Sequence, residues 1–233
     1  MARPRPPGRL DALARAALEL FSERGYRRTQ IADVAKRVGV SPGSIYAYVS
    51  SKEALLELAL LCAFGAEPRA GALPLRTPSR STLVRQVRAR LQRQLKRARM
   101  GALARRTAPD DVGAELRAVL GELYDGLAEN AAVIRLLERV APDRPELGAL
   151  YFGRLRVDVI ERVRAYLARR IGEGRLRPVP DVPIAARLVI ETTAWFAWHR
   201  LGDPFPQPMD AALARETVVE VLARGLLPGG NVP

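Results

Sequence analysis

The chain has 233 residues, a formal net charge of +13 at pH 7 and a sequence pI near 11.0. Hydrophobic residues make up 48% of it and charged residues 27%, a balance typical of a folded globular protein, which excludes a disordered chain. The excess of positive charge indicates a polyanionic partner, and nucleic acid is the simplest candidate.

The first 26 residues predict a short arm followed by a helix. Residues 1–8 are basic and rich in proline, so we expect a disordered arm. Arg3, Arg5 and Arg9 either touch the minor groove or phosphates of DNA, or belong to a solvated tail. An amphipathic helix follows over residues 10–26, with Leu13 and Leu20 on its apolar face.

The stretch 29–52 predicts two short helices that meet at a glycine. Apolar residues recur at the spacing of one helix face: Ile31, Val34, Ala35 and Val38. Thr29 is placed to cap this helix, and Gly39 can take the left-handed conformation that ends it. Ser41 then caps a second helix with Pro42 at its first position, and Val49 belongs to its buried face.

Two helices joined in this way form a helix-turn-helix, which lays its second helix in the major groove of DNA. The alternative is an αα-hairpin inside an ordinary helical protein. The flanking residues favour the first interpretation. The chain resembles the TetR (tetracycline-repressor) family of bacterial transcriptional regulators over about residues 9–60. The resemblance rests on Phe21-x-x-x-Gly25-Tyr26, Thr29, Gly39-Val40-Ser41, Ile45-Tyr46-x-Tyr48 and Ser51-Lys52-Glu53-x-Leu55.

Val49 departs from this pattern, because the family usually carries an aromatic residue there. The resemblance implies DNA contacts to phosphates or base edges by residues in and around the two helices. These are Thr29, Ser41, Pro42, Gly43, Ser44, Tyr46, Tyr48 and Lys52. Few of them form strong bidentate contacts with bases, so we expect modest direct readout together with some recognition of DNA shape.

The rest of the chain predicts further helices and almost no strand. The expected helices span 52–65, 82–106, 109–128, 131–140, 146–171, 184–201 and 209–227, and a proline-rich loop spans 67–79. The fold class is therefore all-α, with nine or ten helices. We expect a helix-turn-helix DNA-binding domain over 9–50, a larger helical effector-binding and dimerisation domain over 51–227, and a tail over 228–233.

The family resemblance implies that the last two helices pair with a second subunit. The candidate dimer residues are Leu188, Ile190, Val218, Val221 and Leu222, and the alternative is that they complete a monomeric core. The resemblance also implies an effector cavity. Its candidate lining residues are Met100, Leu103, Leu120, Tyr124, Tyr151, Phe152, Leu155, Trp195, Trp198 and His199, although core packing or dimer contact competes for each of them.

The stretch 68–109 contains twelve basic residues and no acidic one. A solvated helix face, an anionic effector site and a field that attracts DNA all remain open explanations. The unknown effector is therefore expected to be apolar or anionic.

Several classes of protein are disfavoured. One histidine, one cysteine and the lack of a phosphate loop or nucleophile motif argue against an enzyme, so we expect no catalytic residues, metal or cofactor. Cys62 alone cannot form an intramolecular disulfide, which fits a reducing cytoplasm. The longest uncharged apolar run, 58–66, is far shorter than the roughly 20 residues of a membrane span, so we expect no membrane association.

The interpretation that follows is a homodimeric repressor, released from a near-palindromic operator in double-stranded DNA by a small molecule. The alternatives are an activator or an effector-independent regulator of the same fold, and a helical interaction protein or enzyme without DNA binding.

Overall fold

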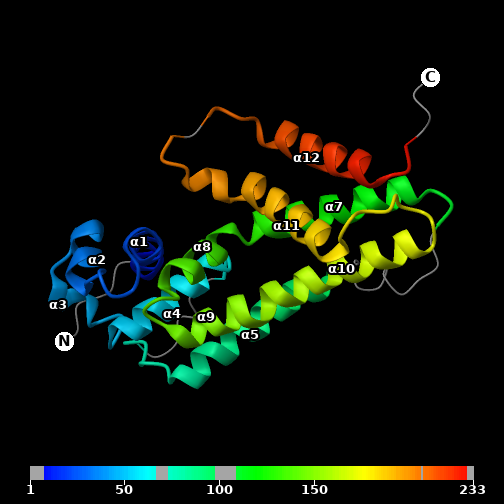
Figure 1. Ribbon diagram of the computed structural model, residues 1–233. Helices are drawn as coiled ribbons and strands as arrows, with labels where there is room; N and C mark the ends of the chain where they lie inside the picture. The colour runs from blue at the N-terminus through cyan, green and yellow to red at the C-terminus, as the bar shows by residue number, and fades with distance from the viewer. Residues whose placement is uncertain (1–7, 67–72, 98–108, 206, 230–233) are drawn as a thin grey trace. The chain divides into compact units, whose positions relative to one another are not determined.

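The computed structural model describes residues 8–66, 73–97, 109–205 and 207–229 (Figure 1). Within these ranges every extended regular element is a helix, which confirms the all-α fold class. A single isolated β-bridge joins Val49 to Leu75. None of the described helices combines the length and the apolar content that crossing a bilayer requires.

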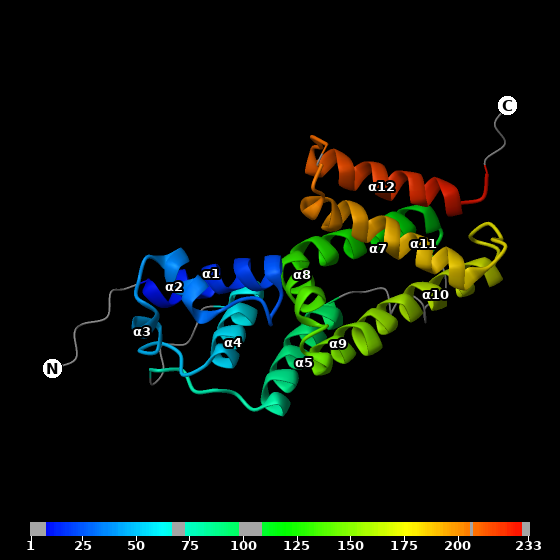
Figure 2. The same cartoon turned by 60° about the vertical axis from the view of Figure 1, so that its left-hand side comes forward.

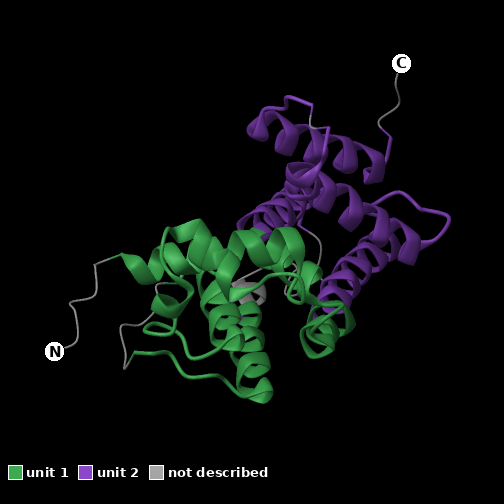
Figure 3. Ribbon diagram, turned by 90° about the vertical axis from the view of Figure 1, so that its left-hand side faces the viewer, with its two compact units in different colours: residues 1–92, 132–154 green, residues 93–131, 155–233 purple. Residues whose placement is uncertain are grey.

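The chain groups by its contacts into two compact units (Figure 3). Unit 1 comprises residues 1–92 and 132–154, and unit 2 comprises residues 93–131 and 155–233. The sequence places a domain boundary at residue 50 instead, because the helix-turn-helix pattern ends there. That functional boundary stays a prediction, since the contact grouping follows packing alone.

Unit 1 begins with four helices that carry the predicted DNA-binding motif. They are α1 (Arg9–Arg24), α2 (Ile31–Val38), α3 (Pro42–Ile45) and α4 (Lys52–Ala63). Helix α1 packs on α4 and α2 because its apolar residues recur along one face. Leu20, Phe21 and Leu55 are at most 1% exposed in this core, and burying each such side chain contributes about 1.5–3 kcal/mol.

Helix α5 (Arg80–Arg97) begins in unit 1, and unit 1 also contains most of α8 (Ala131–Val140) and all of α9 (Pro145–Leu150). The sequence predicts one continuous helix over 146–171. The structure instead has a π-helical turn over Tyr151–Leu155 between α9 and α10 (Arg156–Gly172). Apolar spacing does not distinguish a π turn from an α turn when the flanking helices carry the pattern.

Unit 2 contains α7 (Val112–Glu129), α10, α11 (Val182–Ala197) and α12 (Ala211–Leu226). Helix α11 packs against the other three, and α12 also packs on α7. The helix expected over 184–201 stops at Ala197 and is followed by a 3-10 turn over His199–Gly202. Charged pairs join the helices at the surface, among them Arg215 with Asp125 at 2.6 Å.

Candidate nucleic-acid interface

The turn between α2 and α3 has the geometry that the sequence predicts. Gly39 has φ of +71°, the left-handed conformation that glycine adopts without a steric penalty. The Val40 N–H donates to the Ala35 carbonyl at 3.0 Å, which satisfies one of the last carbonyls of α2. Val34, Ala35 and Ile45 are fully buried where the two helices cross. This motif is therefore held by its own core.

The start of α2 differs from the expectation. Gln30, not Thr29, is the N-cap, and its N–H donates to the Asp33 carboxylate at 2.8 Å in a capping box. Thr29 is fully buried, and its hydroxyl lies 3.1 Å from the Leu20 carbonyl and 2.8 Å from the Gly25 carbonyl. The Thr29 side chain thus contacts the main chain at the end of α1 and stabilises the loop between α1 and α2. Because it is buried, its hydroxyl is not available to a phosphate.

The start of α3 matches the prediction. The Ser44 N–H donates to Ser41 Oγ at 3.3 Å, and the two hydroxyls are 2.7 Å apart. Ser41, Pro42, Gly43 and Ser44 are all exposed, and an added Cβ at Gly43 would meet no atom within 4 Å. A DNA backbone or base edge can therefore approach this turn closely.

Helix α3 is shorter than expected. It ends at Ile45, and the next residues form a tight turn in which the Tyr48 N–H donates to the Ile45 carbonyl at 2.8 Å. Tyr46 is 51% exposed, whereas Tyr48 is 8% exposed and Val49 is fully buried. Tyr46 is therefore the aromatic side chain of this motif that is open to a base, and a phosphate contact by Tyr48 stays a prediction.

Lys52 is the first residue of α4 and packs on the ring of Tyr26. Its Nζ lies 4.5 Å from the ring centroid and donates to the Arg27 carbonyl at 3.3 Å. Burial lowers the pKa of Lys52 from its ordinary value, while Glu53 and two aspartates act in the opposite direction. The ammonium group is thus held in place between α1 and α4, where the family resemblance puts a phosphate contact.

The phenol of Tyr26 donates a hydrogen bond of 2.7 Å to the Glu53 carboxylate. Burial, and then this hydrogen bond, raise the pKa of Tyr26 from its ordinary value to about 12. The contact joins the end of α1 to the start of α4, beside Lys52.

The raised pKa of Tyr26 predicts a stability difference that depends on pH. The Tyr26 phenol loses its proton near pH 10 in the unfolded chain and near pH 12 in the folded chain. The stability that this pKa difference contributes is therefore complete below pH 10 and is lost as pH rises through 12. We expect the stability advantage of the wild type over Tyr26→Phe to shrink across this range in urea unfolding. A stability advantage that stays constant across this pH range would contradict the prediction. Tyr46→Phe, which removes an exposed phenol, is the matched control.

One element of this region was not predicted from the sequence. The segment 73–79, expected only as part of a loop, lies against the end of α3 and is hydrogen-bonded to residues 48–51 (Figure 2). The sequence does not predict this contact, because two main-chain hydrogen bonds form without any periodic pattern of side chains.

The basic arm is described only in part. Arg3 and Arg5 lie outside the described residues. Arg9 begins α1, and its guanidinium donates to the Val38 carbonyl at 3.3 Å, at the end of α2. Arg9 therefore links the start of α1 to the end of α2. The sequence analysis predicted either a DNA contact or a solvated tail for this residue, and not this contact.

The candidate effector residues are divided between the two units. Met100 and Leu103 lie outside the described residues. Tyr151 and Phe152 belong to unit 1, and the others belong to unit 2, where Trp195 is 43% exposed and His199 is also exposed. The buried members in unit 2 are Leu120, Tyr124, Leu155 and Trp198. An effector site at these residues stays a prediction.

His199 and Trp198 stack with ring centroids 3.6 Å apart. Burial lowers the pKa of His199, while Glu191 acts in the opposite direction. Tyr124 donates its phenol to the Phe196 carbonyl at 3.1 Å, so this hydroxyl already has a partner within unit 2.

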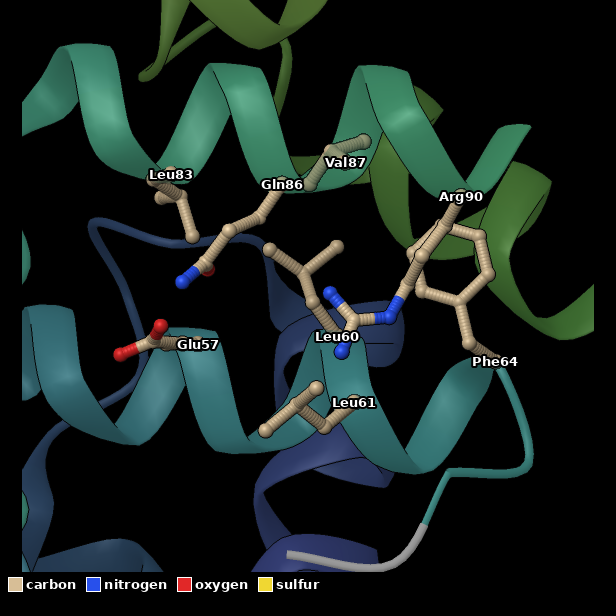
Figure 4. A pocket seen from close by; sticks show the side chains of 8 residues that line it. All are labelled: Glu57, Leu60, Leu61, Phe64, Leu83, Gln86, Val87 and Arg90. Carbon is tan, nitrogen blue, oxygen red and sulfur yellow. The ribbon is translucent and has the colours of Figure 1, made fainter. Parts of the chain in front are cut away.

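A small recess lies elsewhere, between α4 and α5 of unit 1 (Figure 4). The guanidinium of Arg90 lies 5.9 Å from the centroid of the Phe64 ring at one end of it. None of the candidate effector residues contributes to its wall. The lining residues are Glu57, Leu60, Leu61, Phe64, Leu83, Gln86, Val87 and Arg90.

The candidate dimer residues divide into two groups. Leu188 and Val221 are 57% and 64% exposed. Ile190, Val218 and Leu222 are buried inside unit 2 and pack in the core of the single chain, so a contact of these three with a second subunit stays a prediction. Each helix carries two apolar stripes, and sequence alone does not tell which of them faces the chain's own core.

Exposed apolar residues on α11 and α12 recur at intervals typical of one face of each helix, namely Ile184, Leu188 and Trp195 on α11 and Leu213 and Val221 on α12. The sequence predicted Leu188 and Val221 as dimer residues and Trp195 as an effector residue, and it missed Ile184 and Leu213. We call these five residues the exposed α11–α12 face. Exposed apolar patches are typical of interaction surfaces, and a dimer contact through this face stays a prediction.

Two family profiles match the chain. The profile described as bacterial regulatory proteins, tetR family, matches residues 13–59, which contain the helix-turn-helix. The profile described as AefR-like transcriptional repressor, C-terminal domain, matches residues 126–224. Together they cover both the candidate interface and most of unit 2.

Individual proteins agree with these profiles. The chain is 44% identical over 41 residues to the fatty acid metabolism regulator protein of Bacillus subtilis, which is 18% of this chain and 21% of that protein. It is 37% identical over 54 residues to the biofilm operon icaADBC HTH-type negative transcriptional regulator IcaR of Staphylococcus aureus, 23% of this chain and 29% of that protein. These matches span less than a third of each relative.

The fold is similar to the ketosteroid transcriptional regulator KstR2 of Mycobacterium tuberculosis. The TM-score is 0.57 at 19% identity, covering 97% of this chain and 98% of the other. The helix-turn-helix geometry, the two profiles and this shared fold agree. The chain belongs to the TetR family of bacterial transcriptional regulators.

Proposed function

We propose that the protein is a homodimeric transcriptional repressor that binds a near-palindromic operator in double-stranded DNA. The observation that carries this proposal is the exposed turn at Ser41–Ser44 with Tyr46 beside it, held on a buried core at the start of a recognition helix. Members of the family are DNA-binding regulators and not enzymes. A cytoplasmic location, with no membrane partner, belongs to the same proposal.

The name of one relative and the description of one family profile favour repression over activation. One relative is named a negative regulator, and the profile matching residues 126–224 is that of a transcriptional repressor. Both are properties of those proteins, and they support the direction of regulation proposed for this one.

The exposed α11–α12 face supports dimerisation. In a two-fold dimer the same face of each subunit meets its copy, which would cover apolar side chains that are otherwise in water. Two recognition helices would then meet half-sites one or more helical turns apart.

Release by a small molecule completes the proposal. The effector would bind in the C-terminal half, in the region of the buried aromatic residues Tyr124 and Trp198, and would shift the balance between DNA-bound and free forms. The curated relatives do not indicate its chemistry, because their similarity to this chain covers only 41 to 54 residues.

The proposal is tested by selecting binding sites for the full chain from a pool of random-sequence duplexes. The double variant Tyr48→Phe, Lys52→Ala is expected to bind the selected duplex at least about tenfold more weakly, because it removes two phosphate contacts per subunit. Arg135→Ala, an exposed charge on α8, is the matched control. A double variant that folds and binds as tightly as the wild type would refute the assignment of these contacts.

A further inference from the structure

The segment 73–79 is fastened to the end of the recognition motif by its main chain. The Leu75 N–H donates to the Tyr48 carbonyl at 2.8 Å, and the Ser50 N–H donates to the Leu75 carbonyl at 2.9 Å. These two bonds form the parallel bridge between Leu75 and Val49. The bridge fixes the segment relative to the turn that follows α3.

Side chains hold the same junction. Thr77 donates its hydroxyl to Ser51 Oγ at 2.8 Å, and its oxygen lies 3.2 Å from Ser50 Oγ. Ser51 Oγ accepts in turn from the Ala54 N–H at 3.1 Å, as the N-cap of α4. Thr77 therefore contacts Ser51, the N-cap residue of α4. Figure 2 shows this segment running from beside α3 to the start of α5.

Arg76 lies between these two anchors. Successive side chains of an extended chain point to opposite sides, and Leu75 is half-buried while Arg76 is exposed. Among the residues that the structure describes, Arg76 has no hydrogen-bonding or ion-pair partner. It is thus a cation on a fixed backbone, next in space to the main chain of Tyr48 and Ser50.

The sequence around Arg76 leaves its charge uncompensated. No acidic residue occurs between Glu67 and Asp110. An arginine in such a position suits a phosphate, because its guanidinium presents two parallel donors and stays charged at every physiological pH. A fixed backbone also lowers the conformational entropy that binding would remove.

We propose that the segment 73–79 is a second DNA-backbone contact, in which Arg76 binds a phosphate adjacent to those reached by the turn between α3 and α4. This inference rests on the proposed DNA-binding function. It extends the DNA-binding surface beyond the helix-turn-helix to a segment that follows α4. A phosphate contact of this kind strengthens binding to every sequence equally and does not select bases.

The test measures how DNA affinity depends on salt. The full chain is titrated against the selected duplex and against a random duplex of the same length, from about 50 to about 300 mM KCl. Arg76→Ala is expected to weaken binding to both duplexes by the same factor. The slope of log affinity against log salt should become shallower by about 1 for each subunit bound.

Three further variants sharpen the result. Arg76→Lys should restore most of the slope, because it keeps the charge. Thr77→Val, which removes the two hydroxyl contacts, should weaken DNA binding in the same direction while the helical circular dichroism signal is retained. Arg135→Ala removes an exposed arginine from α8, which lies away from α3 within unit 1 in both views of the ribbon, and its slope should equal that of the wild type (Figures 1 and 2).

The outcomes separate this inference from the proposed function. If Arg76→Ala keeps the wild-type slope, Arg76 is a solvated arginine and the second contact is refuted, while DNA binding stands. If Arg76→Ala lowers affinity for the selected duplex alone, the residue reads sequence and the proposed phosphate contact is wrong. If the wild type selects no sequence and binds neither duplex, the inference and the proposed function fail together.

Discussion

Glu115→Ala is expected to lower the free energy of unfolding of unit 2 by about 3 kcal/mol, the low end for breaking a buried ion pair, because it removes one of the two carboxylates that pair with a buried guanidinium. The Arg170 side chain is 0% exposed. Its Nε and Nη2 donate to the two oxygens of Glu115 at 2.8 and 3.1 Å, and its Nη1 donates to Glu173 at 2.8 Å. The hydrogen bond with Glu115 is the main cause that raises the pKa of Arg170, so the guanidinium stays charged.

The same carboxylate accepts a hydrogen bond of 3.0 Å from the Tyr166 phenol. Burial, and then the charge of Glu115, raise the pKa of Tyr166. Glu115, near the start of α7, thus accepts hydrogen bonds from two buried residues of α10. Its removal would leave both without this acceptor.

Urea unfolding followed by tryptophan fluorescence measures this effect directly, because both tryptophans of the chain, Trp195 and Trp198, lie in unit 2. Glu129→Ala, an exposed position on the same helix, should change stability by less than about 0.5 kcal/mol. Replacing both partners, as in Glu115→Leu with Arg170→Met, should cost less than Glu115→Ala alone. A loss for Glu115→Ala no larger than that of the control would show that the buried pair does not hold α7 and α10 together.

The second large effect is expected at the exposed α11–α12 face. The double variant Leu188→Gln, Val221→Gln should raise the dimer dissociation constant at least about 100-fold. A two-fold dimer would lose four buried apolar side chains, each of which contributes about 1.5–3 kcal/mol. Glutamine is uncharged, so the attraction of each subunit for DNA is unaltered.

Sedimentation over a range of protein concentrations measures this change, and DNA titration measures its consequence. Below the new dissociation constant, operator affinity should fall by about 100-fold or more, because binding of the two half-sites is no longer linked. Val157→Gln on α10, 46% exposed, is the matched control and should leave both measurements unchanged. A double variant that sediments as a dimer at the wild-type concentrations would place the interface elsewhere.

Sequence patterns predicted the parts of the interface that depend on local chemistry. The turn at Gly39 and the cap at Ser41 follow from residue types whose conformations and hydrogen bonds are set within four or five residues. The buried positions Val34, Ala35 and Ile45 follow from helical spacing. The family resemblance added the expected phosphate contacts, which spacing alone does not indicate.

Three features that the sequence did not predict share one physical cause, which is that they depend on residues distant in the sequence. Thr29 is an acceptable cap by type, but its hydroxyl is taken by the end of α1. Val218 and Leu222 are apolar on a helix with two apolar stripes, and only the packing of α12 on α7 and α11 decides which stripe is buried. The bridge at Leu75 joins residues 26 positions apart through the main chain, which no side-chain pattern records.

Specific recognition of an operator is the central claim, and one measurement tests it most directly. The full chain is titrated at physiological salt against the selected duplex and against the same duplex with both half-sites scrambled. We predict that two chains bind the selected duplex, and that its affinity exceeds that of the scrambled duplex by at least about 10³-fold. Equal affinities for the two duplexes would contradict the assignment of this protein as a sequence-specific repressor.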